Sequence, residues 1–201
     1  MAFTYFFRDM HTLQLIATNV IPYLYGRSKI KIWDAGCAMG QEAYSMAIVF
    51  AENLGHFAFK NLHIDATDID GSDQFEEIIV NGVYHESELK RIPRELFKNY
   101  FKPVKNTGYF KVVDTVRKSI NFQKHDLLSL RSIGTGYSLI ICKNVLLHFQ
   151  PGQRIEVIRM FHNSLDAGGF FATEQTQKLP EETEHLFERV SSDGQLFRKV
   201  S

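Results

Sequence analysis

The sequence has few cysteines and no excess of charge of either sign. Only two cysteines, Cys37 and Cys142, occur in 201 residues, which excludes a disulfide-rich secreted scaffold. One disulfide between them remains an alternative, but their apolar surroundings predict two reduced, buried thiols. The 23 basic residues equal the 23 acidic ones, which argues against a basic protein that coats nucleic acid.

Long apolar runs are also missing. No stretch approaches the roughly 18 residues that cross a bilayer. The beginning, MAFTYFFRDM, places Arg8 and Asp9 directly after its aromatic residues and has no small-residue cleavage site. We therefore expect a cytoplasmic protein with no membrane insertion. At 44% apolar residues, a chain of this length forms a core without help from disulfides or metal.

The histidines show no metal-binding spacing. Neither H-E-x-x-H nor C-x-x-C occurs, so we expect no metal site. The aromatic residues near the start (Phe3, Tyr5, Phe6, Phe7) predict a plug over a pocket or the core rather than a stacking platform for nucleic acid.

Short apolar runs alternate with helical patterns along the chain. Strands are expected at 30–36, 62–70, 137–145 and 168–175, and helices at 41–55, 72–79 and 151–165. Gly55 is expected to end the first helix, Ser72 or Asp73 to cap the second, and Pro151 to lie in the first turn of the third. Strands that are apolar on both faces and alternate with helices predict an α/β fold whose parallel sheet is covered on both sides.

The end of the chain differs from this alternation. The segment 185–200, HLFERVSSDGQLFRKV, has two period-2 runs around Ser-Asp-Gly, which predicts an antiparallel hairpin. A parallel sheet that ends in such a hairpin is typical of the common class I S-adenosylmethionine-dependent methyltransferase fold, which has a Rossmann-like sheet.

The stretch 84–123 also interrupts the alternation. It contains a helical run at 88–101 and two short strands, 108–113 and 119–126, around a turn-like D-T-V-R-K. Between Lys90 and Lys118 there are nine basic residues and two acidic ones, a local net charge of +7. Two interpretations remain open: a solvated helix face, or a docking surface for an acidic macromolecule.

Two acids follow the first two predicted strands. Gly36 and Gly40 bracket a turn at the sheet edge where open α/β sheets bind ligands, but the G-x-G-x-x-G fingerprint of dinucleotide sites is absent. Glu42, in the first helical turn, would repel a pyrophosphate and suits an α-ammonium group; alternatively it only complements the helix dipole.

The second strand ends in ATDID, where Asp68 and Asp70 share one face of an extended segment. An acid at the position of Asp68 suits ribose hydroxyls, whereas Asp70 suits a turn. Glu42 and Asp68 together favour S-adenosylmethionine over NAD.

Seven motifs together resemble the CheR family of bacterial chemotaxis receptor methyltransferases. They follow the family's order over essentially the whole chain: TYFFRD (4–9), AGCAMGQEAYSMA (35–47), ATDID (66–70), NGVYHESELK (81–90), LFKNYF (96–101), HDLL (125–128) and CKNVLLHF (142–149). The resemblance covers the family's catalytic region, and the family's N-terminal helical domain has no counterpart in this sequence.

The resemblance implies an enzyme that esterifies glutamate side chains of chemoreceptors with S-adenosylmethionine and releases S-adenosylhomocysteine. It implies that Arg8 and His148 act at the acceptor. The residues expected at the cofactor, including Gly36 from the first turn, are Thr4, Arg8, Gly36, Glu42, Asp68, Asp126, Leu127, Asn144 and Val145. Among these, Asp126 and Leu127 would border the adenine. The region 84–123 corresponds to the family's small β-subdomain, which implies that a chemoreceptor-like substrate docks there.

Several positions depart from the family pattern. Gln41 replaces the first of two acids, Lys143 replaces an arginine and His148 replaces a tyrosine, for which a packing role is the alternative. The segment 172–177, ATEQTQ, replaces G-H-S-E. Two functions therefore stay open: a protein-glutamate O-methyltransferase, or a cofactor-binding adaptor with weak or no catalysis. Methylation of another protein, a small molecule or RNA is the remaining alternative.

Overall fold

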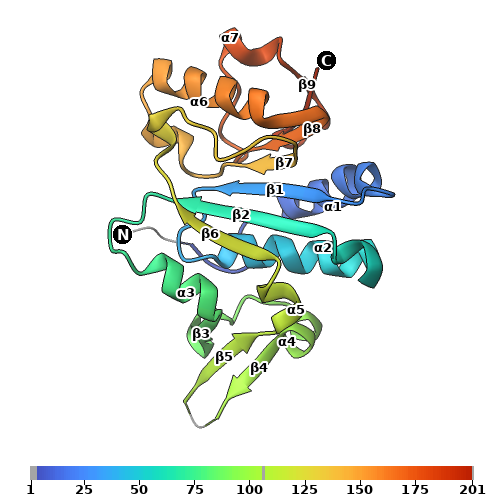
Figure 1. Ribbon diagram of the computed structural model, residues 1–201, viewed down its shortest axis with the longest axis vertical. Coiled ribbons are helices and arrows are strands. Elements are labelled where there is room, and N and C mark those ends of the chain that lie inside the picture. The colour runs from blue at the N-terminus through green and yellow to red at the C-terminus, as the bar shows by residue number, and fades with distance from the viewer. Residues whose placement is uncertain (1–3, 106, 201) are drawn as a thin grey trace.

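The computed structural model describes residues 4–105 and 107–200. Its centre is a sheet of strand order β6-β2-β1-β7-β8-β10-β9 (Figure 1). The first five of these run parallel, and their bounds are β6 Ile120–Lys124, β2 Leu62–Asp68, β1 Ile30–Ala35, β7 Tyr137–Ile141 and β8 Leu165–Ala172. The last two strands are β10 (Leu196–Lys199) and β9 (Phe187–Arg189). β10 runs antiparallel to both β8 and β9, so the predicted parallel sheet with a C-terminal hairpin is confirmed.

Helices cover both faces of this sheet. The longer ones are α1 Met10–Leu24, α2 Gln41–Phe59 and α6 Pro151–Ser164. The shorter ones are α3 Phe75–Asn81, α4 Arg94–Tyr100, α5 Asp114–Arg117 and α7 Glu181–Glu184, with 3₁₀ turns η1 Glu86–Glu88, η2 Leu127–Ser129 and η3 Leu146–His148. Within the described ranges, no helix combines the length and the apolar character needed to span a bilayer.

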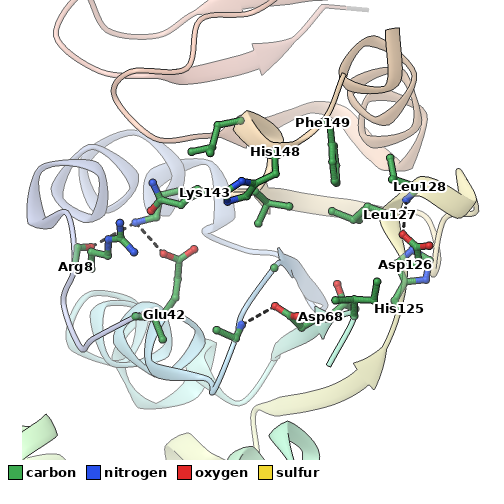
Figure 2. Close-up of a pocket in the computed structure, with 18 residues that line it drawn as sticks. Arg8, Glu42, Asp68, His125, Asp126, Leu127, Leu128, Lys143, His148 and Phe149 are labelled. Atoms are coloured by element: carbon green, nitrogen blue, oxygen red, sulfur yellow. Dashed lines mark hydrogen bonds and ion pairs between the residues drawn. The ribbon is translucent and has the colours of Figure 1, made fainter. Parts of the chain in front are cut away.

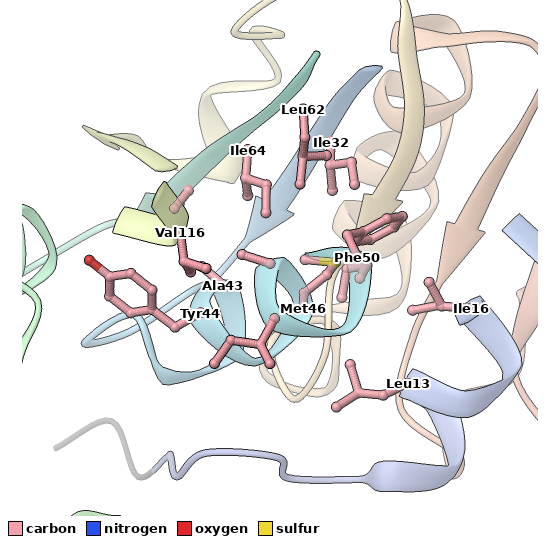
Figure 3. Packing of buried hydrophobic residues seen from close by; sticks show 14 of the residues in the cluster. Leu13, Ile16, Ile32, Ala43, Tyr44, Met46, Phe50, Leu62, Ile64 and Val116 are labelled. Carbon is pink, nitrogen blue, oxygen red and sulfur yellow. The ribbon is translucent and has the colours of Figure 1, made fainter. Parts of the chain in front are cut away.

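Alternation along the strands divides the core into two layers. Ile32 and Leu139 belong to the layer under α1 and α2, whereas their chain neighbours Trp33 and Ile140 belong to the layer under α6. Successive side chains of a strand point to opposite faces, which explains why these strands are apolar throughout. Figure 3 shows the first layer, where side chains from α1 and α2 meet those from β1 and β2.

A second, smaller sheet is inserted between β2 and β6. It has the order β3-β5-β4, with β3 Val83–His85, β5 Tyr109–Val112 and β4 Phe101–Val104, and it lies beyond α2 and α5 in Figure 1. The strand expected at 119–126 exists, but it pairs with β2 at the edge of the large sheet. The D-T-V-R segment expected as a turn is the helix α5. The region 84–123 therefore contains most of the small sheet and also β6, which belongs to the large sheet.

Three helix boundaries differ from the predictions. Helix α2 continues past Gly55 to Phe59, and Gly55 marks a break in the helix (φ 73°, ψ 162°) rather than its end. Helix α3 is capped by neither Ser72 nor Asp73. Instead the Asp70 carboxylate accepts the Phe75 N–H at 2.9 Å. Of the run 88–101, only Arg94–Tyr100 is α-helical; Glu88 ends η1, Phe101 begins β4, and Pro93, with an extended backbone (φ −53°, ψ 135°), directly precedes the helix.

The N-terminal segment binds the two sheets together. Phe6 is 0% exposed and makes edge-to-face contacts with Tyr84 at 4.9 Å and Phe101 at 5.4 Å between ring centroids. Phe7 is also buried, and its N–H donates to Ser45 Oγ at 2.8 Å. These two residues form the predicted plug, whereas Phe3 lies outside the described residues.

We expect Phe6→Ala to lower the free energy of unfolding by about 3–5 kcal/mol, because it removes a buried ring and leaves a cavity between the two sheets. Urea unfolding monitored by circular dichroism measures the change. Phe57→Ala is the matched control: that ring is 85% exposed, so the expected change is within about 0.5 kcal/mol. Equal effects of the two substitutions would contradict the packing role of Phe6.

Candidate active site

A cavity of about 570 Å³ opens at the carboxyl ends of the parallel strands. Every site residue expected from the sequence lines it: Thr4, Arg8, Gly36, Glu42, Asp68, Asp126, Leu127, Asn144, Val145 and His148. Figure 2 shows that the cavity has two unlike ends. Arg8, Lys143 and Glu42 gather at one end, and Leu127 and Leu128 lie at the other, beside His125 and Asp126.

The turn after β1 forms part of the cavity wall. Gly36 has φ 101°, and its N–H donates to the Thr67 carbonyl at 2.7 Å. A Cβ atom on Gly36 would lie 2.2 Å from Val145 Cγ2, so only glycine permits this approach of the two segments. The turn after β1 thus brings Gly36 close to Val145, which lies in the segment after β7.

Asp68, the last residue of β2, holds the same turn from the side. One carboxylate oxygen accepts the Ala38 N–H at 2.9 Å, and the other accepts the Asp70 N–H at 3.3 Å. The prediction that Asp68 and Asp70 share a face is wrong, because the strand ends at Asp68 and Asp70 has φ 38°. Asp70 faces α3, as its capping bond requires, and only Asp68 lines the cavity.

Lys143 is the centre of the charged end. Its ammonium lies 2.9 Å from Glu42 Oε2 and 3.9 Å from Asp9 Oδ2, and it donates to the Arg8 carbonyl at 3.4 Å. Burial alone would lower the pKa of Lys143, but the attraction of Glu42, Asp9 and Asp34 outweighs burial and raises it. Lys143 therefore stays charged, and Glu42 does more than complement a helix dipole.

Arg8 and His148 reach the cavity from different segments. Arg8 is half-buried between Phe7 and Asp9, which both have left-handed backbones (φ 56° and 60°). Such a conformation is strained for a non-glycine residue and fixes the direction of the side chain between them. His148 is exposed at the end of η3, so it lies at the cavity rim rather than in a packed core.

The other end of the cavity is built on the segment after β6. The Asp126 carboxylate accepts the Leu128 N–H at 2.8 Å and so caps η2, which presents Leu127 and Leu128 to the cavity. The His125 N–H donates to the Asp68 carbonyl at 2.8 Å and ties this segment to β2. Burial lowers the pKa of the His125 side chain, so its imidazole is neutral at pH 7.

The backbone of Asn144 is held by the carboxylate of Glu174, which was not among the residues predicted from the sequence. That backbone is left-handed (φ 59°), and the Asn144 N–H donates to Glu174 Oε2 at 2.9 Å. The Thr173 hydroxyl donates to the same oxygen at 2.8 Å. Glu174 lies in the segment that replaces G-H-S-E, just after β8, and its position at the carboxyl end of a parallel strand was the signal that could have identified it.

Asp34 and Lys143 are the other residues whose roles were missed. Asp34 is an acid inside the buried strand β1. Lys143 follows the buried Cys142 along the chain and borders the cavity. Cys37 and Cys142 are free thiols, as expected, and burial raises the pKa of both well above the usual value. Neither thiol is therefore a nucleophile. Among the described residues, no cluster of His, Cys, Asp or Glu side chains could hold a metal ion.

Comparison with known proteins agrees with this geometry. The sequence profile described as CheR methyltransferase, SAM binding domain, matches residues 2–195. A probable chemotaxis protein methyltransferase of Rhizobium etli is 28% identical over 194 residues, which are 94% of this chain and 72% of that protein. A chemotaxis protein methyltransferase of Vibrio parahaemolyticus is 29% identical over 201 residues, which are 98% of this chain and 72% of that protein.

A solved structure supports the fold alone. The crystal structure of DszA carbon methyltransferase superimposes with a TM-score of 0.51 at 14% sequence identity. The match covers 87% of this chain and 37% of that one. The large sheet and its helices are thus those of a class I methyltransferase.

We expect Gly36→Ala to weaken S-adenosylhomocysteine binding by about tenfold or more, because the added methyl group collides with Val145 and the turn must move. Isothermal titration calorimetry gives the affinity. Gly152→Ala is the control, since a Cβ there meets no atom within 4 Å. Unchanged binding in Gly36→Ala would show that the turn does not contribute to the cofactor site.

Proposed function

The chain belongs to the CheR methyltransferase family, and from this premise we propose that it methylates glutamate carboxylates of chemoreceptor-like proteins. It is an S-adenosylmethionine-dependent methyltransferase, as membership of the family requires. The observation that carries the proposal is the cavity, which has a charged end at Glu42 and Lys143 and a second end where Leu127 and Leu128 lie beside Asp126. The amino-acid part of S-adenosylmethionine suits the charged end, and its nucleoside part suits the other end. A carboxylate acceptor would lie beside the cofactor.

The residues present suit the cofactor. A zwitterionic amino-acid group needs an acid and cations, which Glu42, Lys143 and Arg8 supply at one end. Asp68 is placed to accept bonds from ribose hydroxyls, as acids at this position do in nucleoside-binding folds.

The remaining expected residues complete the wall of the cofactor site. Asp126 and Leu127 would border the adenine, while Thr4, Gly36, Asn144 and Val145 would surround the methionine part. Carboxylates at the helix start and strand end disfavour a phosphate-bearing ligand.

The chemistry requires positioning more than proton transfer. S-adenosylmethionine, when bound, supplies a methyl group activated by its sulfonium. A glutamate acceptor is already ionised at neutral pH, because its ordinary pKa is about 4.3, so no general base is needed. The guanidinium of Arg8 would orient that carboxylate, and His148 at the rim would limit its approach. Exact placement of two reacting groups supplies a large part of such an acceleration.

The test combines binding with product analysis. Calorimetry with S-adenosylhomocysteine should give heat and a single site, and tritiated S-adenosylmethionine should label a chemoreceptor cytoplasmic domain in an alkali-labile form. We expect Arg8→Ala to lower kcat/KM for this labelling by about tenfold or more, since an orienting charge is lost. Arg159→Ala is the control, because Arg159 pairs with Glu156 on the surface of α6.

Other results would decide for the alternatives. Binding of S-adenosylhomocysteine without any labelled protein would support the adaptor function. Label that resists alkali would indicate an acceptor other than a carboxylate. An unchanged rate in Arg8→Ala would remove Arg8 from the site.

The proposal includes a docking surface on the small sheet and α4. Its exposed cations are Arg94 and Lys98 of α4, Lys102 and Lys105 in and just after β4, and Lys90 and Arg91 just before α4. Lys98 pairs with Glu95, and the half-buried Arg117 pairs with Asp114, which are the two acids between Lys90 and Lys118. Most of the positive charge is thus available to a partner, and an acidic segment of a receptor is the partner that it suits.

We expect the double substitution Lys102→Glu and Lys105→Glu to raise KM for the receptor domain severalfold, with S-adenosylhomocysteine affinity unchanged. The wild-type KM should rise with salt, and the variant should lose most of that dependence. Lys29→Glu with Lys178→Glu is a charge-matched control on exposed residues outside this surface. Equal KM values for both variants would favour the solvated-face interpretation.

A further inference from the structure

Asp34 is a buried acid that none of the steps above uses. It lies in β1, two residues before Gly36, and is 0% exposed. Neither carboxylate oxygen accepts a hydrogen bond from any group in the described part of the chain. An ionised carboxylate without donors is strongly unfavourable in a protein interior, so its protonation state needs an explanation.

The groups around Asp34 leave one favourable arrangement. The titratable and charged side chains that face it are Glu42 of α2, Asp68 of β2, Cys37 of the turn after β1, and Cys142 and Lys143 after β7. Burial raises the pKa of Asp34 well above its usual value, and the negative charge of the neighbouring Glu42 raises it further, while Lys143 opposes the shift. A single ammonium cannot neutralise both neighbouring acids.

We propose that Asp34 is a positioning residue that keeps its proton at neutral pH and donates it in a hydrogen bond to the Glu42 carboxylate. The proton stays on Asp34, so no net transfer occurs. Glu42 is then held between a neutral donor and the Lys143 ammonium, which lies 2.9 Å from its Oε2 atom. The pair of Glu42 and Lys143 is neutral overall, and no uncompensated charge is buried.

This arrangement explains how Glu42 serves the cavity. Glu42 must remain ionised and fixed in direction to receive an ammonium group, and two partners from different segments, β1 and the segment after β7, fix it better than one. The inference rests on the proposed function, because the benefit of an oriented Glu42 is the binding of the cofactor's amino-acid end. The proton on Asp34 itself can be tested without any cofactor.

Two substitutions separate the possible roles of Asp34. Asp34→Asn keeps a donor of the same size without a charge, and we expect its S-adenosylhomocysteine affinity to stay within about twofold of the wild type. Asp34→Val removes the donor, and we expect an affinity about tenfold lower. Isothermal titration calorimetry at about pH 7 measures both. Loss of binding in Asp34→Asn equal to that in Asp34→Val would mean that Asp34 acts as an anion and would overturn the proposal.

The pH dependence of stability gives an independent readout. A carboxyl whose pKa is raised on folding favours the folded state less as pH rises from its unfolded to its folded pKa. The melting temperature of the wild type should therefore fall relative to that of Asp34→Asn as pH rises. The infrared C=O band of a protonated carboxylic acid should be present in the wild type and absent in Asp34→Asn.

Each contrary result has a distinct meaning. A melting-temperature difference that does not change with pH, or a missing infrared band, would overturn the proton on Asp34. Wild-type affinity in both variants would overturn its positioning role. If the wild type fails to bind S-adenosylhomocysteine, the proposed function fails, while the stability and infrared measurements still decide the protonation state.

Discussion

The candidate active site depends on one buried ammonium group. Of the lysines and arginines in residues 4–105 and 107–200, only Lys143 is buried, at 6% exposure. Its partners come from α2 and from the N-terminal segment, while Lys143 itself follows β7. A buried charge is tolerated only when it is paired, so the pairing of Lys143 links the positions of these three segments.

The sequence predicts most of the cavity because of a property of parallel sheets. The turns after parallel strands meet at one edge, so motifs after the strands around 30–36, 62–70 and 137–145 had to converge there. Roles that depend on a partner from another strand could not be read in this way. Asp34 and Glu174 are acids near apolar runs, and only the packing shows that one faces Glu42 and the other holds the Asn144 N–H.

The errors in the predicted elements arise partly from long-range pairing, which a local pattern does not name, and partly from local backbone turns. The segment 119–126 alternates as a strand in either sheet, and its pairing with β2 decides the matter. Asp70 is four residues before the helical cap position, and it reaches the Phe75 N–H only because the intervening turn folds back. The break at Gly55 likewise interrupts the helix without ending it.

The N-terminal segment connects the small sheet, on which the proposed docking surface lies, to the cavity. Phe6 packs against Tyr84 and Phe101 of the small sheet, and Arg8, two residues later, lines the cavity. The Tyr84 hydroxyl also donates to the Met39 carbonyl at 2.8 Å, in the turn after β1. Under the proposed docking, a substrate on the small sheet would contact the same packed core that holds the segment with Arg8.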